Sequence, residues 1–154
     1  VMPEVARIGF MADSVRIPTD AVSLIILNVT FQSESALDGT VSLDMIGYGS
    51  AFHSRMMGKA PATFSDMVLA QAGAMGIGMT FKADTSSTGL SDHEAYERAG
   101  IPATCVCWRT DPVYHTAEDV SSHVVTSKVA TAGRLVLEFA RGLDSAELAT
   151  LQAR

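Results

Sequence analysis

From residue 40 onward, short apolar runs of strand length alternate with helical patterns, and this alternation limits the folds that the chain can adopt. Strands are recognised by β-branched and apolar runs, and helices by apolar residues at a spacing of three to four. We predict strands at residues 22–31, 40–46, 77–82 and 103–108, and helices at residues 61–75, 92–99 and 121–141. Such alternation favours an α/β fold with helices on both faces of a sheet.

The ends of the predicted helices carry recognisable signals. Thr63 precedes Asp66 by three residues and is expected to cap the first helix. Ser121 or Ser122 is expected to cap the last one, with Asp119 stabilising the same end by roughly 1 kcal/mol.

Size and charge restrict the class of protein. The 154 residues are predicted to form a single domain, and with 47% hydrophobic and 18% charged residues the chain is globular. The net charge of -6 and the absence of a basic cluster argue against nucleic acid as a partner. The sequence has no run of 18 apolar residues that would predict a membrane span, and no signal-peptide pattern follows Val1. Either a leader was removed or the chain is a piece of something longer.

Asp44 is the residue that most suggests chemistry. It follows an apolar strand, and an unpaired carboxylate in such surroundings costs several kcal/mol unless a metal, a cation or a proton neutralises it. Asp92, His93 and His115 follow or close other short runs. Ligands in α/β folds gather beyond the carboxyl ends of strands, and Asp and neutral His are good zinc ligands. We therefore predict a metal site at one edge of the sheet.

Plainer interpretations of these residues stay open. Asp44 would otherwise cap a loop, and His115 would bond to backbone. Glu34, after the strand that ends at Phe31, is either a solvated loop acid or the general base that a metal-bound water requires. Cys105 and Cys107 point to one face of a strand and are predicted to be buried small hydrophobes, with zinc binding as the minority alternative.

Four motifs in one order indicate a family. They are Leu-Asp-Met-Ile-Gly-Tyr at residues 43–48, Ser-Asp-His at 91–93, Gly-Ile-Pro-Ala at 100–103 and Tyr-His-Thr at 114–116. In order and spacing the chain resembles the C-terminal half of the co-catalytic dizinc aminopeptidases, metallo-exopeptidase family twenty-eight. The resemblance is clear over residues 39–142. It implies a shortened three-layer sandwich with a mixed, mainly parallel sheet between helices.

The resemblance also implies roles for single residues. Asp44 and His115 match zinc ligands, and Asp92 matches an acid that supports the site near the catalytic base. Ser91, His93 and Tyr114 match positions that line the substrate pocket. One or two zinc ions and a peptide substrate with a free N-terminus are implied, and relatives are often secreted or periplasmic.

Residues 1–38 depart from the family pattern and are interpreted as a divergent or remnant segment. Met11 stands where the family has a ligand histidine, and thioether sulfur is a poor zinc ligand. Asp20 faintly matches the bridging carboxylate and is a third candidate ligand. Glu34 matches one of a glutamate pair, whose second member is Ser35 here.

The matching motifs and the departures in residues 1–38 leave two possible functions. The first is a zinc-dependent aminopeptidase-like hydrolase in which metal-activated water cleaves N-terminal residues of peptides. The second is a catalytically inactive relative or partial chain that serves as a structural or interaction module. A shortened sheet also has an exposed edge, so we expect that the chain can form a homo-oligomer through it.

Overall fold

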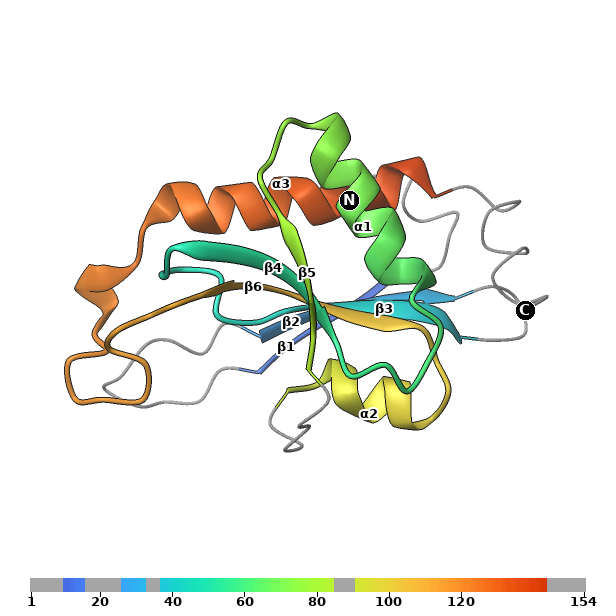
Figure 1. Ribbon diagram of the computed structural model, residues 1–154, viewed down its shortest axis with the longest axis horizontal. Coiled ribbons are helices and arrows are strands. Elements are labelled where there is room, and N and C mark those ends of the chain that lie inside the picture. Colours follow the sequence, from blue (N-terminus) through green and yellow to red (C-terminus); the bar gives the residue numbers. More distant parts are fainter. Residues whose placement is uncertain (1–9, 16–25, 33–36, 85–90, 144–154) are drawn as a thin grey trace.

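One sheet between two layers of helices forms the molecule (Figure 1). The structure, a computed structural model, describes residues 10–15, 26–32, 37–84 and 91–143. Helices α1 (Thr63–Ala74) and α3 (Thr126–Gly142) cover one face of the sheet, and α2 (His93–Arg98) covers the other. The predicted α/β sandwich is therefore confirmed. Within these residues, no helix is long and apolar enough to cross a membrane.

The sheet is mixed and has the strand order β1-β2-β3-β6-β4-β5. The strands are β1 (Phe10–Val15), β2 (Ile26–Gln32), β3 (Leu37–Leu43), β4 (Ala51–Met56), β5 (Thr80–Ala83) and β6 (Ala103–Arg109). Within the described residues, the pairs β3–β6 and β4–β5 are parallel, and the other three pairs are antiparallel. The parallel share is smaller than predicted, because the four residues between β2 and β3 are too few for the crossover that parallel strands need.

The parallel pair β3–β6 determines where loops leave the sheet. Leu43, the last residue of β3, pairs with Val106 in the middle of β6, and Met45 O, just after β3, accepts a hydrogen bond from Trp108 N. The segments that follow these two strands therefore begin at the same edge of the sheet. They carry Asp44 and His115 respectively.

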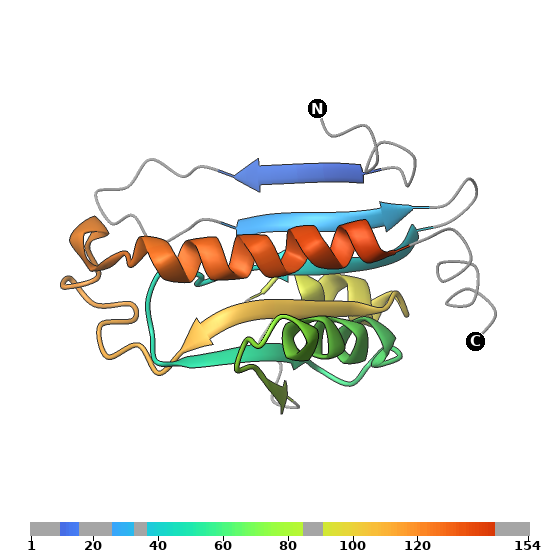
Figure 2. The same cartoon turned by 90° about the horizontal axis from the view of Figure 1, so that it is seen from above.

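The two faces of the sheet differ in chemistry. On one face, Val41, Leu43 and Val106 pack against helices α1 and α3, which lie side by side in Figure 2 and contact each other through Phe64 and Phe139. Strand alternation turns Thr40, Ser42, Cys105 and Cys107 toward the other face, where α2 lies. Both thiols are free and buried, as predicted for small core residues.

Both predicted helix caps are wrong. Thr63 is already the first residue of α1, and the preceding Ala62 offers no side-chain cap. Helix α3 begins only at Thr126, because Val124 and Val125 have extended backbone. Ser121 instead opens a short 3-10 turn, η2 (Ser121–His123), and neither η2 nor α3 receives a capping bond from a side chain such as Asp119.

Strand β4 has no counterpart among the predicted elements. Its buried positions alternate, but one of them is a serine, so its sequence does not show an apolar alternation. Ser54 Oγ lies 2.8 Å from both Ser65 Oγ and Thr104 Oγ1, which satisfies its hydroxyl in the core. Five methionines are buried in the core or packed against it: Met56, Met57, Met67, Met75 and Met79.

Candidate active site

Asp44 stands directly after β3 with its carboxylate half-buried. Its backbone N–H donates to Val106 O over 3.2 Å, which keeps it beside β6. Its Oδ2 accepts a hydrogen bond from Ser91 Oγ over 3.3 Å. Burial raises the pKa of Asp44, the Ser91 bond lowers it, and the nearby charge of Asp92 raises it again. The net direction is upward, so this carboxylate is in an environment that a cation would stabilise.

Ser91 connects Asp44 to a buried histidine. His93 Nδ1 lies 3.1 Å from Ser91 Oγ, and since the hydroxyl proton points to Asp44, we infer that Nδ1 carries a proton and donates to Ser91. His93 is 1% exposed, and burial lowers its pKa to about 4, so its ring is neutral at pH 7. Its Nε2 lies 4.0 Å from Glu97 Oε1 and has no hydrogen-bond partner among the described residues.

Asp92 directly precedes α2 and is exposed, and its carboxylate is bound by β2, the strand next to β3. Asn28 Nδ2, on β2, donates to Asp92 Oδ2 over 2.7 Å. Asp92 is also near enough to Asp44 to raise its pKa. The Ser-Asp-His motif therefore acts as a unit: Ser91 holds Asp44, Asp92 binds to β2, and His93 supports Ser91.

His115 and Tyr114 occupy the loop that follows β6. Both side chains are exposed, and their ring centroids are 3.9 Å apart. His115 has a left-handed backbone with φ of 57°, which a non-glycine residue adopts only where its surroundings impose it. Thr116 closes the turn by donating its N–H and its hydroxyl to Val113 O. The loop starts at the same sheet edge as Asp44, but no described contact joins His115 to Asp44.

The described residues do not complete a zinc site. No group of three or more His, Cys, Asp or Glu side chains comes close enough to hold a metal ion in the part of the chain that the structure describes. Zinc sites in proteins use three or four such ligands. Asp44 and His115 alone would bind zinc weakly, and the third candidate ligand, Asp20, lies outside the described residues.

Glu34, the candidate general base, also lies outside the described residues. Its described neighbour Gln32 pairs with Leu37 at one end of the β2–β3 hairpin. Leu43, which precedes Asp44, pairs with Leu27 at the other end. Gln32 is five residue steps along β2 from Leu27, which corresponds to roughly 17 Å along a strand.

Sequence reasoning missed Arg109 and Glu97. Arg109 ends β6, and its guanidinium donates to Met45 Sδ over 3.5 Å and lies over the Tyr114 ring. Glu97 is 1% exposed and accepts hydrogen bonds from the backbone N–H groups of Met57, at 2.7 Å, and Lys59, at 3.0 Å. The signal for Arg109 was a charged residue ending a buried strand. Glu97 resembles any exposed helix acid in sequence.

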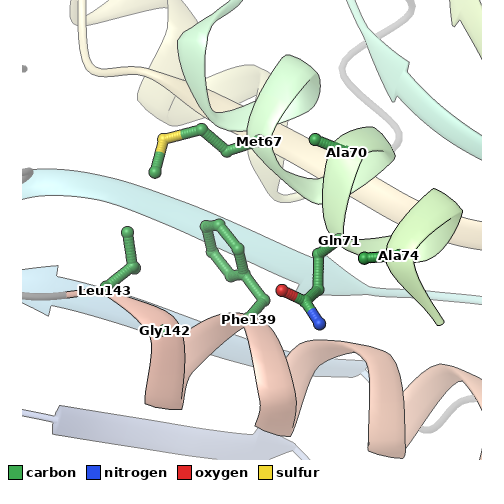
Figure 3. A pocket seen from close by; sticks show the side chains of 7 residues that line it. All are labelled: Met67, Ala70, Gln71, Ala74, Phe139, Gly142 and Leu143. Carbon is green, nitrogen blue, oxygen red and sulfur yellow. The ribbon is translucent and has the colours of Figure 1, made fainter.

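A pocket of about 330 Å³ lies away from these residues, between α1 and α3 (Figure 3). Side chains from both helices line it: Met67, Ala70, Gln71 and Ala74 from α1, with Phe139 from α3. None of its lining side chains can titrate at ordinary pH or bind zinc, so this pocket offers no acid–base or metal chemistry.

Known proteins were compared with the chain by sequence and by fold. Residues 28–140 match the model of peptidase family M28. No curated protein matches the chain. Two structures of BSAP, a zinc aminopeptidase from Bacillus subtilis, are similar at 24% identity, with TM-scores of 0.55 and 0.53 over 66% and 64% of this chain and 26% of that one. The LapA aminopeptidase of Legionella pneumophila is similar at 19% identity, with a TM-score of 0.56 over 65% of this chain and 29% of that one.

These solved structures show the fold, and this chain spans less than a third of the length of either aminopeptidase. The family model covers more than half of the chain, including the Asp44, Ser-Asp-His and His115 motifs. The chain therefore belongs to peptidase family M28.

Proposed function

We propose that the protein is a zinc-dependent peptide hydrolase of the aminopeptidase type and that Asp44 and His115 are its metal ligands. The observation that carries this proposal is the support built around Asp44, a half-buried carboxylate held by Ser91 and backed by neutral His93. Carboxylates that bind metals are themselves oriented by hydrogen bonds from such neighbours. Membership of a peptidase family and similarity to two aminopeptidases point to the same reaction.

Each residue has a role in this proposal. Asp44 contributes negative charge at the sheet edge, and Ser91 fixes the direction of its carboxylate. Asp92, bound by Asn28 of β2, supports the site, and Tyr114 lines the substrate pocket with Ser91. His93 was also expected to line the pocket, but it is 1% exposed and instead supports Ser91 from the core. Zinc, when bound in such sites, lowers the pKa of a bound water and polarises the peptide carbonyl. The described residues explain how Asp44 is oriented. They do not include a group that would activate the attacking water.

In this proposal Asp20 is a further metal ligand and Glu34 is the general base. A base that acts on metal-bound water must lie within hydrogen-bond reach of it, directly or through one further water.

One observation favours a second function, that of a non-catalytic relative. Among the described residues no three ligands come together, whereas Ser91 and Glu97 form hydrogen bonds to other protein groups. The chain would then keep the family scaffold as a structural or interaction module.

Zinc content and peptidase activity distinguish the two functions. The purified chain is loaded with zinc, dialysed and measured by elemental mass spectrometry, and release of a leucyl fluorophore is followed. For the hydrolase we expect one or two zincs per chain, with zinc affinity and activity reduced at least about 100-fold in Asp44→Ala and His115→Ala. Asp66→Ala and His53→Ala are matched controls outside the site and should leave both unchanged.

Absence of bound zinc and of activity in the unmutated chain would contradict the hydrolase. Unfolding measured with and without chelator adds an independent readout, because a bound metal stabilises the folded state by mass action. If the chelator leaves the unfolding midpoint unchanged, the non-catalytic function is supported.

A further inference from the structure

Arg109 is a half-buried cation whose described partners are not anions. Its Nη1 donates to Met45 Sδ over 3.5 Å, and its Cζ lies 5.6 Å from the centroid of the Tyr114 ring. Thioether sulfur is a weak acceptor, and a guanidinium has five N–H donors in a fixed fork. Most of the donors of Arg109 therefore lack an acceptor in the part of the chain that the structure describes.

Two other described arginines have carboxylate partners, and Arg134, for which no ion pair is described, is exposed to solvent whereas Arg109 is half-buried. Arg55 forms an ion pair with Asp84, and Arg141 forms one with Glu138. No ion pair of this kind includes Arg109 among the described residues. A partly desolvated guanidinium without a carboxylate is costly to keep, and it is suited to an anionic ligand that binds later.

The position of Arg109 connects it to the candidate active site from two sides. Met45, its sulfur partner, follows Asp44 directly, and Tyr114, its aromatic partner, precedes His115. Both proposed ligands are thus one residue away from a contact of Arg109. A molecule bound next to Asp44 and His115 would have the guanidinium within reach.

The backbone around Arg109 is held in a costly conformation. Three described non-glycine residues have left-handed backbone, Met45 (φ 54°), Thr110 (φ 60°) and His115 (φ 57°), and each is in contact with Arg109 or adjacent to it or to Tyr114. Such conformations cost of order 1–3 kcal/mol each and concentrate at ligand-binding sites. Arg109 O also accepts a hydrogen bond from Ser50 N over 2.8 Å, and a Cβ at Gly49 would lie 2.5 Å from that oxygen.

We propose that Arg109 forms a carboxylate-binding subsite of the proposed peptidase and selects peptides that carry a carboxylate just beyond the bond to be cleaved. The proposal rests on the proposed function for the identity of the ligand as a peptide. The guanidinium fork binds a carboxylate through two parallel hydrogen bonds, and Tyr114 holds the fork in place through its ring face. The carboxylate is either the C-terminus of a dipeptide or an acidic side chain next to the N-terminal residue.

The test measures binding and turnover separately on the full chain. Dissociation constants are determined by NMR titration for leucyl-glycine, for leucyl-glycinamide and for leucyl-glutamic acid 1-amide, which has an acidic side chain and no terminal carboxylate. We expect at least one acidic peptide to bind about tenfold or more tightly than leucyl-glycinamide, as for a bidentate charged pair. Which acidic peptide binds more tightly identifies the source of the carboxylate.

Substitutions assign the preference to Arg109. Arg109→Gln should reduce the acid-to-amide ratio to about one, and Arg109→Lys, which keeps the charge but not the fork, should retain only part of it. Arg134→Gln, an exposed arginine of α3, is the matched control and should keep the full ratio. If Arg109→Gln fails to fold, the lysine variant and the comparison of acid with amide in the unmutated chain still decide.

Equal affinity for acids and amide, no binding of any of the three peptides, or a preference that survives in Arg109→Gln would overturn the subsite. Failure of the proposed function has a different signature. If the chain binds acidic peptides preferentially but never hydrolyses them, the Arg109 subsite is supported and the proposed hydrolase is contradicted. If it hydrolyses peptides without preferring acidic ones, the hydrolase is supported and the subsite is contradicted.

Discussion

Ser91 Oγ donates a hydrogen bond to Asp44 Oδ2 over 3.3 Å, although the two residues are 47 positions apart in the chain. The bond connects the segment after β3 with the segment before α2. It opposes the effect of burial on the carboxyl group of Asp44, which would otherwise titrate at still higher pH.

Ser91→Ala should therefore raise the pKa of Asp44 further above its ordinary value. Burial and the charge of Asp92 remain in the variant, while the bond that lowers the pKa is lost. The measurement is a pH titration of the Asp44 carboxyl carbon by NMR in the metal-free chain. An Asp44 pKa that is unchanged or lower in Ser91→Ala would contradict the assigned hydrogen bond.

The buried His93 should make the protein less stable in mild acid. In the unfolded chain the imidazole takes up a proton near pH 6.5, but in the folded chain burial, followed by the charge of Arg55, lowers its pKa to about 4. The folded pKa is depressed, so this contribution to stability is present above pH 6.5 and is lost as the pH falls toward 4. The loss is at most about 3 kcal/mol in the free energy of unfolding.

Urea unfolding at pH 7, 5.5 and 4 measures this loss, and His93→Gln should be free of it. The difference in unfolding free energy between the unmutated chain and His93→Gln should shrink as the pH falls. An NMR titration of the His93 ring that gives a pKa near 6.5 would argue against the buried neutral state.

Gly39→Ala should destabilise the core. A Cβ at Gly39 would lie 2.5 Å from two ring carbons of Phe64, a fully buried side chain of α1. Overpacking of this kind costs about 1–3 kcal/mol. Gly133→Ala in α3 is the matched control: nothing lies within 4 Å of its Cβ, and a helical alanine gains about 0.5–1 kcal/mol. Urea unfolding should thus give shifts of opposite sign, and two shifts of one sign would refute the packing argument.

Glu97→Ala should destabilise the fold much more than removal of a surface glutamate. The variant loses two charged hydrogen bonds and leaves the N–H groups of Met57 and Lys59 without their acceptor, which we expect to cost about 3 kcal/mol. Glu138→Ala breaks only an exposed pair with Arg141 and should cost less than about 0.5 kcal/mol. Unfolding midpoints compare the two, and faster amide exchange at Met57 and Lys59 should accompany the first. Similar midpoints would mean that Glu97 does not hold this loop.

The sequence was sufficient to predict the elements whose apolar pattern is regular. Helix α3 and strand β6 were predicted because their buried residues recur at the helical and strand spacing. Strand β4 was missed because Ser54 takes a core position through hydrogen bonds to residues distant in the chain. The caps failed because a capping residue is defined by backbone dihedrals, which residue type alone does not determine.

The candidate site was predictable in its short motifs and not in its distant contacts. Asp44 and Ser91 were found as motif members, and their hydrogen bond requires β3 and α2 to be packed first. The role of Arg109 depends on Met45 and Tyr114, which reach it only through the paired ends of β3 and β6. Asp20 and Glu34 lie outside the described residues, so their roles remain predictions.

The strand order implies a delay during synthesis. β3 and β4 are neighbours in the chain, but β6 lies between them in the sheet and emerges from the ribosome about 50 residues later. Until then β3 and β4 each present an unpaired edge, which is where strands of other molecules attach. A nascent chain that stops before residue 103 would contain β1-β2-β3 and β4-β5 as separate parts of the sheet, without the strand β6 that joins them. Such a chain would be a natural client for a chaperone.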